Sequence, residues 1–403
     1  MFKKIYLDHA ATTPLDPQVL KAMLPYLKEK YGNPSSLYQK GIESKEAVNG
    51  ARKKVAKVLG GHEEEIIFCG SGTESDNLAL RGTARAYKKK GNHIITTQIE
   101  HHAVLNTAHA LEKKGYEVTY LKVDKEGLVN PADLEKAIKK ETILVSIMYA
   151  NNEIGTIEPI AEIGKITQEK GIIFHTDACQ AAGALPLDVH RLKVDLFTLN
   201  GSKIYGPKGT GVLYIRQGVK IDPIITGGSQ ERNLRAGTEN VAGIVGLAKA
   251  LEIAETKRKI ESRRLINLRD YLIKGILAKI PRVILNGSQD KRLPNNINVS
   301  ILDVEGESLI LYLDKYGIQT STGSACTSVN LEPSHVLLAL GLPYEYAHGS
   351  LRLTLGKNTA KKDLDYVLKV LPQIVKKLRE ISPVKLGLEP EKSKHPQVKK
   401  VKV

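Results

Sequence analysis

The stretch LNGSKIYGPKGTG, residues 199–211, decides how the middle of this chain is interpreted. The apolar run Val194–Leu199 before it predicts a buried strand, and Gly211–Ile215 predicts another. Between the two runs, glycines crowd around two lysines, Lys203 and Lys208. Three structures fit this pattern: a loop that cradles phosphate, a plain strand–turn–strand, and a turn that presents a reactive amine. Residues elsewhere in the chain are needed to choose among them.

Short apolar runs alternate with helical patterns from about residue 50 to 240. The runs are almost continuously apolar, which is typical of strands buried on both faces of a parallel sheet. Helical patterns such as Thr73–Lys90 and Val104–Lys114 lie between them, and Asn130-Pro131 is a good helix start. This order predicts an α/β domain with a mostly parallel sheet. The expected strands are Glu65–Cys69, His93–Ile99, Val118–Val123, Ile143–Ala150, Gly171–His175, Val194–Leu199 and Gly211–Ile215.

The last third of the chain predicts a second, smaller α+β domain. Val241–Ile280 reads as one or two long helices that Pro281 ends. We place the large domain at residues 16–258 and the small domain at residues 1–15 and 259–383. Residues 384–403 hold six lysines and two glutamates without an apolar period, which predicts a flexible basic tail. The expected elements after Pro281 are strands Val283–Leu285, Ile297–Leu302 and Leu351–Leu355 and helices Glu307–Lys315 and Lys361–Glu380.

Composition narrows the class of function. The chain has 403 residues, 41% of them hydrophobic, enough for two domains. Its three cysteines form no C-x-x-C pair, so neither a structural zinc site nor a disulfide framework is indicated. No apolar run spans a membrane and the N-terminus lacks a signal core, so we expect a cytoplasmic protein. The net charge of +16 is compatible with nucleic-acid binding, but scattered lysines and 5% aromatic residues argue against it.

Polar groups follow five of the expected strands. In open parallel sheets ligands bind beyond the carboxyl ends of the strands, so these groups indicate an active site. The groups are Gly70-Ser71-Gly72-Thr73, Glu100-His101-His102, Asn151-Asn152-Glu153, Asp177-Ala178-Cys179-Gln180 and Asn200-Gly201-Ser202-Lys203.

Three of these groups together indicate a pyridoxal phosphate (PLP) site. Gly70–Thr73 opens a helix, where free N–H groups suit a phosphate, although an ordinary helix cap fits as well. Asp177 suits a metal ligand, a general base, a helix cap or the counter-charge of a protonated ring nitrogen. Lys203, if partly desolvated, can form a Schiff base. A phosphate site, an aspartate for a pyridinium nitrogen and a Schiff-base lysine are the parts of a PLP site.

Three more residues are candidates for chemistry. His101 suits stacking on a cofactor ring or proton transfer. Cys326 lies in STGSACTS (321–328), where small residues predict a mobile loop with an accessible thiol; a buried cysteine is the alternative, and we assign Cys69 and Cys179 to it. Strand alternation puts Arg352 on the face of Thr354, where it either clamps a carboxylate or faces solvent.

Taken in order, the motifs resemble one family. YLDHAATTP, GNPSSLY, SGTESDN, EHHAV, NNEIG, HTDACQ, GSKIYGPKG, RAGTEN, STGSACTS and LRLTLG follow one another from Tyr6 to Gly356. In this order they are similar to those of the NifS/IscS-like cysteine desulfurases, class V aminotransferases among the fold-type I PLP enzymes. The resemblance implies a large PLP-binding domain with a mostly parallel seven-stranded sheet and a smaller α+β domain.

The resemblance implies how the cofactor ring would be held. Lys203 would bind PLP as a Schiff base and move protons at the substrate α-carbon. Asp177 would pair with the pyridinium nitrogen, Gln180 would face the ring hydroxyl, and His101 would stack over the ring.

The resemblance also implies how the phosphate would be held. Gly72, Thr73 and Ser202 would bind it from one subunit, and Thr238 would reach it across a homodimer interface. In relatives a His often occupies the position of Ser202, whereas this chain reads Asn200-Gly201-Ser202-Lys203. The details of phosphate binding are therefore expected to differ here. Cys179 and Tyr38 also depart from the common Thr and His, and the basic tail has no clear counterpart.

On the substrate side, Asn152, which also touches the cofactor, and Arg352 would hold the carboxylate. Cys326 would attack the sulfur of L-cysteine, leaving a persulfide and releasing L-alanine. The sulfur would pass to an acceptor such as an iron–sulfur scaffold protein. No permanently bound metal is expected. Cys326 is a candidate for a transient ligand of an iron–sulfur cluster. The alternative is a selenocysteine lyase or another class V aminotransferase-like enzyme, but a plain transaminase has no use for a second nucleophile such as Cys326.

Overall fold

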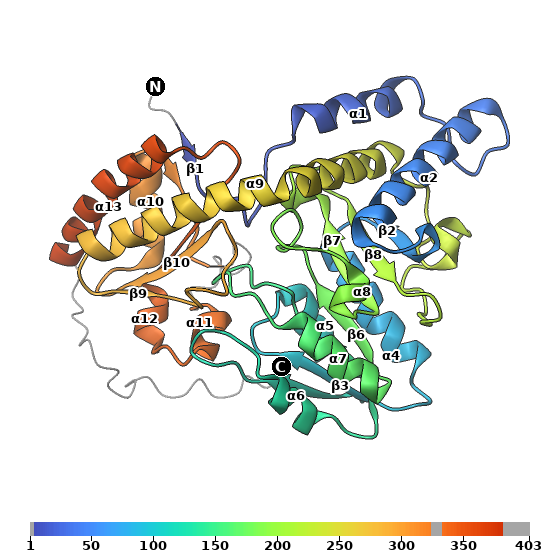
Figure 1. Ribbon diagram of the computed structural model, residues 1–403, viewed down its shortest axis with the longest axis horizontal. Coiled ribbons are helices and arrows are strands. Elements are labelled where there is room, and N and C mark those ends of the chain that lie inside the picture. The colour runs from blue at the N-terminus through green and yellow to red at the C-terminus, as the bar shows by residue number, and fades with distance from the viewer. Residues whose placement is uncertain (1–3, 324–332, 382–403) are drawn as a thin grey trace.

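In this computed structural model, residues 4–323 and 333–381 are described. Within these ranges no helix is both long enough and apolar enough to cross a membrane. The chain forms two bodies joined by one long helix, and the N-terminal segment belongs to the smaller body (Figure 1).

The larger body is built on a seven-stranded sheet, as the sequence predicts. Only β8 runs antiparallel to its neighbours, and the other strands are parallel to one another. The carboxyl ends of the parallel strands therefore meet along one edge of the sheet. In spatial order the strands are β2 (Ile66–Cys69), β8 (Gly211–Ile215), β7 (Leu196–Asn200), β6 (Ile173–Asp177), β5 (Thr142–Ser146), β3 (His93–Thr97) and β4 (Glu117–Leu121).

Alternate strand residues enter two separate cores, one on each face of this sheet. Phe174 and Phe197 pack on the face that also receives α2, α7 and the start of α9. Ile173 and Leu196 pack on the other face, against residues of α4 and α5. The helices are α1 (Pro17–Lys28), α2 (Gln39–Leu59), α3 (Gly72–Asn77), α4 (Thr83–Ala86), α5 (His102–Glu112), α6 (Pro131–Ala137), α7 (Ile160–Lys170), α8 (Val189–Leu192) and α9 (Val241–Lys279).

Helix α9 links the two bodies, and it is one helix rather than two (Figure 1). Its first part, up to Leu251, packs into a core of the large sheet, and its later part, from Leu265 to Ile276, packs into the core of the small body. The side chain of Asn240 accepts a hydrogen bond from the Gly243 amide and caps its start. A domain boundary near residue 258 falls inside this helix and stays a prediction.

The smaller body has a three-stranded antiparallel sheet in the order β12-β10-β9. The N-terminal strand β1 (Ile5–Tyr6) pairs with β11 (Ile318–Gln319), which brings the start of the chain to this body. The remaining elements are β9 (Val283–Leu285), β10 (Asn296–Ile301), α10 (Gly306–Lys315), α11 (His335–Ala339), α12 (Tyr344–His348), β12 (Ser350–Thr354) and α13 (Lys361–Ile381).

Two boundaries differ from the sequence expectations in ways that matter. The helix expected at Thr73–Lys90 contains a π-helical turn, Leu78–Gly82, and ends at Ala86. Strand β6 ends at Asp177, two residues later than expected. His175 and Asp177 are therefore both within one strand and point to the same face.

Candidate active site

A cavity of about 310 Å³ lies at the carboxyl edge of the large sheet and brings together most of the residues singled out from the sequence. Thr238 is not among its lining residues, and Cys326 lies outside the described residues. The sequence-predicted residues that line it are Gly72, Thr73, His101, Asn152, Asp177, Gln180, Ser202, Lys203 and Arg352.

The turn that carries Lys203 is held by the N-terminal segment. The Lys203 ammonium donates to the carbonyl oxygen of Ala11 at 2.5 Å, and Thr13 donates twice to the carbonyl oxygen of Ser202, at 2.9 Å each. Gly201 permits the tight turn, because a Cβ there would lie 2.5 Å from the Thr210 hydroxyl. Lys203 is thus presented to the cavity by a braced turn, whereas Lys208 in the same loop is exposed.

Asp177 presents a buried carboxylate to the same cavity. One oxygen accepts a hydrogen bond from the Cys179 amide at 2.9 Å, and only 7% of the residue is exposed. The side-chain amide of Gln180 donates to the carbonyl oxygen of Ala10 at 3.0 Å. The helix-cap interpretation of Asp177 is wrong, because turns follow β6 and the next helix, α8, begins at Val189.

The Ser71–Thr73 turn is shaped for close approach. Ser71 caps α3 by accepting from the Glu74 amide at 3.0 Å. A Cβ on Gly72 would lie 2.8 Å from the sulfur of Cys179 and 3.2 Å from the side-chain nitrogen of Asn200, so only glycine fits there. Ser202 donates to the side-chain oxygen of Asn200 at 3.4 Å. Gly72 and Thr73 at the start of α3 and Ser202 all line the cavity, a set of residues that suits an anion.

His101 caps helix α5 with its ring. Its Nδ1 accepts a hydrogen bond from the Ala103 amide at 3.1 Å, which leaves the proton of the neutral ring on Nε2. Burial lowers the pKa of His101, against the opposing charge of Asp177, so the ring is neutral at pH 7. A neutral ring at the cavity wall suits stacking on an aromatic cofactor.

Sequence reasoning missed a group of buried polar side chains next to the cavity, of which Asp76 is part of the cavity lining. His175 contacts the hydroxyls of Ser146 at 2.8 Å and Thr198 at 3.0 Å, and burial lowers its pKa to about 4. One carboxyl oxygen of Asp76 lies 3.6 Å from His175 and has no hydrogen-bond partner among the described residues. Burial and the charge of Asp177 raise the pKa of Asp76 well above its usual range. The position of His175, two residues before Asp177 on a strand, was the signal that could have found this group.

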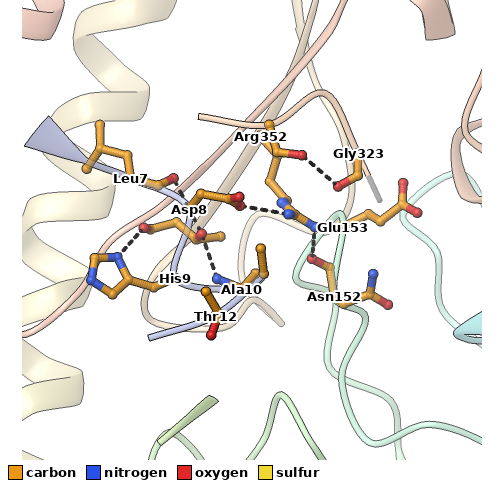
Figure 2. Close-up of polar contacts among 12 residues, drawn as sticks. Leu7, Asp8, His9, Ala10, Thr12, Asn152, Glu153, Gly323 and Arg352 are labelled. Atoms are coloured by element: carbon orange, nitrogen blue, oxygen red, sulfur yellow. Dashed lines mark hydrogen bonds and ion pairs between the residues drawn. The ribbon is translucent and has the colours of Figure 1, made fainter. Parts of the chain in front are cut away.

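Arg352 is buried, so the solvent-facing interpretation of this residue is wrong. Its guanidinium pairs with Asp8 at 2.8 Å and donates to the carbonyl oxygen of Asn152 at 3.1 Å (Figure 2). Asp8 was not among the sequence candidates, although it lies in the YLDHAATTP motif.

The other cysteines behave as expected for buried thiols. Burial raises the pKa of Cys69 to about 12 and that of Cys179 well above its ordinary value. In the described parts of the chain, no cluster of three His, Cys, Asp or Glu side chains is arranged to hold a metal ion.

Comparison with known proteins identifies the family. The model of the aminotransferase class-V family matches residues 5–367. This chain belongs to the class V aminotransferase family. Curated family relatives include "Cysteine desulfurase IscS" of Dictyoglomus turgidum, 57% identical over 96% of this chain and 98% of the relative. The same name is carried by a protein of Methanosarcina thermophila, 58% identical over 95% of this chain and 94% of the relative. A solved "NIFS-LIKE PROTEIN" superposes with a TM-score of 0.88 at 40% identity, over 93% of this chain and all of that one.

The cavity fits the PLP that class V enzymes use. It offers an amine from Lys203, a buried carboxylate from Asp177, and the start of helix α3 at Gly72 and Thr73. A volume of about 310 Å³ suits a small cofactor with an amino-acid substrate beside it. The donor set is thus of the kind that a pyridine ring, an aldehyde carbon and a phosphate need.

Proposed function

We propose that this PLP-dependent cysteine desulfurase moves the sulfur of L-cysteine onto Cys326 as a persulfide, works as a homodimer, and passes the sulfur to an acceptor protein such as an iron–sulfur scaffold. The observation that carries the proposal is that Lys203, Asp177 and Arg352 line one cavity. An amine, a carboxylate and a buried guanidinium in one cavity match a PLP site that lies beside a binding site for the carboxylate of an amino acid.

In this proposal the chain's own residues hold and orient the cofactor. Asp177 keeps a proton on the ring nitrogen, Gln180 faces the ring hydroxyl, and neutral His101 covers the ring. The Gly72 and Thr73 amides and the Ser202 hydroxyl hold the phosphate. When bound, PLP withdraws electrons from the substrate α-carbon and so weakens the Cβ–S bond.

The substrate is held and cleaved by four groups of the chain. Arg352 and Asn152 bind its carboxylate, and the amine of Lys203 carries protons to and from its α-carbon. The Cys326 thiolate forms a bond to the substrate sulfur as the Cβ–S bond breaks, and the bonding pair left on Cβ takes a proton. The balance is L-cysteine plus a thiol to L-alanine plus a persulfide, so no external oxidant or reductant is needed.

The homodimer is supported by an apolar stripe on α1. Leu20, Leu24 and Leu27 are 42%, 40% and 58% exposed and share one face of that helix. Such a face is typical of a surface that another subunit covers. Sedimentation of the wild type should report a dimer, and Leu24→Glu with Leu27→Glu should shift it to a monomer. Lys21→Glu, on an exposed position of the same helix, should leave the dimer intact.

The placement of Thr238 supports the same dimer. Thr238 is exposed, and its loop is held next to the turn Gly70–Thr73. Arg235 of this loop pairs with Glu74 at 2.9 Å, and Glu74 accepts a hydrogen bond from the Gly70 amide. We propose that Thr238 reaches the phosphate of the partner subunit. A monomeric wild-type enzyme with full activity would contradict both parts of this proposal.

Two coarser features complete the proposal. Residues 1–15 and 259–383 form the small domain, supported by the two cores that α9 enters, while the tail expected at 384–403 lies outside the described residues. We place the enzyme in the cytoplasm, because a thiol that must stay reduced between turnovers needs a reducing compartment.

The test is turnover of L-cysteine with L-alanine and sulfide both measured in the presence of a reductant. Cys326→Ser should keep bound cofactor yet lose sulfide release, because the sulfur has no acceptor. Cys69→Ala, which alters a buried thiol outside the cavity lining, should keep most of the activity. Retained sulfide release in Cys326→Ser, or faster turnover of L-selenocysteine with little of L-cysteine, would argue for another reaction.

A further inference from the structure

Asp8 and Arg352 form a buried ion pair between distant parts of the chain. Asp8 follows strand β1 and Arg352 lies in β12, yet a carboxylate oxygen of Asp8 is 2.8 Å from a guanidinium Nη (Figure 2). The side chain of Arg352 is 2% exposed and that of Asp8 is 16% exposed. Asp8 is not among the residues lining the cavity, whereas Arg352 is. The Asp8 carboxylate therefore acts on the site through Arg352, whereas its main-chain carbonyl accepts from the amide of cavity-lining Ala11 at 3.1 Å.

The main chain around Asp8 is fixed to the strand that carries Arg352. Thr354 donates its amide to the carbonyl oxygen of Leu7 at 2.7 Å, and its hydroxyl accepts from the Ala10 amide at 2.9 Å. The Tyr6 hydroxyl donates to the carbonyl oxygen of Asp8 at 2.9 Å. Because the chain is tied on both sides of Asp8, its carboxylate has a set position relative to the Arg352 backbone. A salt bridge with such fixed geometry orients a guanidinium, unlike a mobile surface pair.

The guanidinium keeps donor capacity beyond its protein partners. One Nη donates to Asp8 and the other to the carbonyl oxygen of Asn152. The Nε–H is buried and finds no hydrogen-bond acceptor within residues 4–323 and 333–381. The Nε is closed off from solvent, so it is not the donor that a ligand in the cavity meets. Each Nη carries a second N–H, and because Arg352 lines the cavity these are the donors that suit a ligand carboxylate.

We propose that Asp8 is a positioning residue that holds the Arg352 guanidinium in the orientation that receives the carboxylate of the amino-acid substrate. The inference rests on the proposed function, in which Arg352 binds that carboxylate. Asp8 touches neither substrate nor cofactor, and its removal weakens carboxylate recognition while leaving the amine chemistry at Lys203 in place.

The test compares two ligands that differ only in the carboxylate. L-Alanine and ethylamine are titrated into the holoenzyme, and binding is followed by the absorbance of the bound cofactor. Asp8→Asn keeps an acceptor oxygen but removes the counter-charge of a buried guanidinium, and is expected to raise the dissociation constant of L-alanine about tenfold or more. Binding of ethylamine should change less than about twofold. In turnover, KM for L-cysteine should rise more than kcat falls.

Two variants control for charge and for reach. Asp16→Asn removes a carboxylate from the same segment, one that pairs with Lys357 at 2.6 Å instead of Arg352, and should bind L-alanine like the wild type. Asp8→Glu restores the charge and should recover part of the affinity. Equal loss of L-alanine and ethylamine binding in Asp8→Asn, or no loss of either, overturns the inference.

Failure of the underlying function gives a different result. If Arg352→Gln bound L-alanine as well as the wild type does, Arg352 would not be the carboxylate site and the proposed function would fall with the inference. If Arg352→Gln lost L-alanine and Asp8→Asn did not, only the positioning role would fall.

Discussion

The hydroxyl of Ser334 donates a hydrogen bond to the buried carboxylate of Glu153 and also caps helix α11, accepting from the amides of Val336 at 3.1 Å and Leu337 at 3.3 Å. The same Glu153 oxygen lies 2.9 Å from the point where a Cβ on Gly323 would be. The Glu153 carboxylate therefore bonds to Ser334 and lies next to Gly323, the two residues near either end of the segment 324–332.

Ser334→Ala removes both the cap and the donor to Glu153. The loss of a cap costs about 1 kcal/mol, and a buried carboxylate left without its donor costs about 1–3 kcal/mol more. We expect the free energy of unfolding to fall by about 2–4 kcal/mol in denaturant titrations.

Ser308→Ala is the matched control. Ser308 also donates to a glutamate, Glu305, at 2.7 Å, but in an exposed pair. Its loss should cost less than about 1 kcal/mol. Equal effects of the two substitutions would show that burial of Glu153 does not govern the strength of the contact.

The residues that the sequence predicted best are those at strand ends. Lys203, Asp177 and His101 each follow or end an apolar run, and parallel strands bring such ends to one edge whatever the loops do. Their shared cavity therefore follows from strand order. The family resemblance then supplied roles that the pattern alone left open, as for Arg352.

What the sequence did not predict are contacts between segments far apart in the chain. Asp8 meets Arg352 because β1 joins the small body, and Asp76 reaches His175 because α3 packs on the large sheet. Neither pairing has a local pattern, because it depends on how complete elements pack. The end of β6 was placed two residues too early for a related reason: a buried strand also accommodates a polar residue such as Asp177 when that residue finds a partner, here the Cys179 amide.

Lys203→Ala should abolish the covalent link to the cofactor. The purified wild type is expected to be yellow, and the variant should lose its colour on gel filtration because only non-covalent contacts remain. Lys208→Ala, in the same loop but exposed, should stay yellow. A Lys203→Ala protein that keeps a covalently bound cofactor, measured by mass spectrometry, would move the Schiff base to another lysine.

The two neighbouring carboxyls at the cavity should respond differently to the same substitution. Burial and the charge of Asp177 raise the pKa of Asp76 well above its usual range, which favours its neutral form, so Asp76→Asn is a mild substitution. We expect it to alter the PLP dissociation constant by less than about threefold. Asp177→Asn removes the counter-charge and should weaken PLP about tenfold or more. Reconstitution of cofactor-free enzyme measures both, and equal losses would show that Asp76 carries the charge instead.

Glu158 makes stability depend on pH. One oxygen of this buried carboxyl accepts from the Val129 amide at 2.9 Å, and burial raises its pKa to about 8 from an ordinary 4.5. Between these pH values the folded protein keeps a proton that the unfolded chain releases. The stabilising contribution is therefore full below about pH 4.5 and is lost as the pH rises towards 8.

Glu158→Gln keeps an acceptor for Val129 and cannot ionise, so it should remove this dependence. Near pH 5, the free energy of unfolding of Glu158→Gln should be close to that of the wild type. Near pH 8 it should be greater by a few kcal/mol, on the order of 1.4 kcal/mol for each pH unit of the window. Thermal or urea unfolding across this range measures the gap. Glu162→Gln, at an exposed position of α7, should show no such widening. A constant gap between wild type and Glu158→Gln would mean that Glu158 is ionised throughout and that another group supplies its counter-charge.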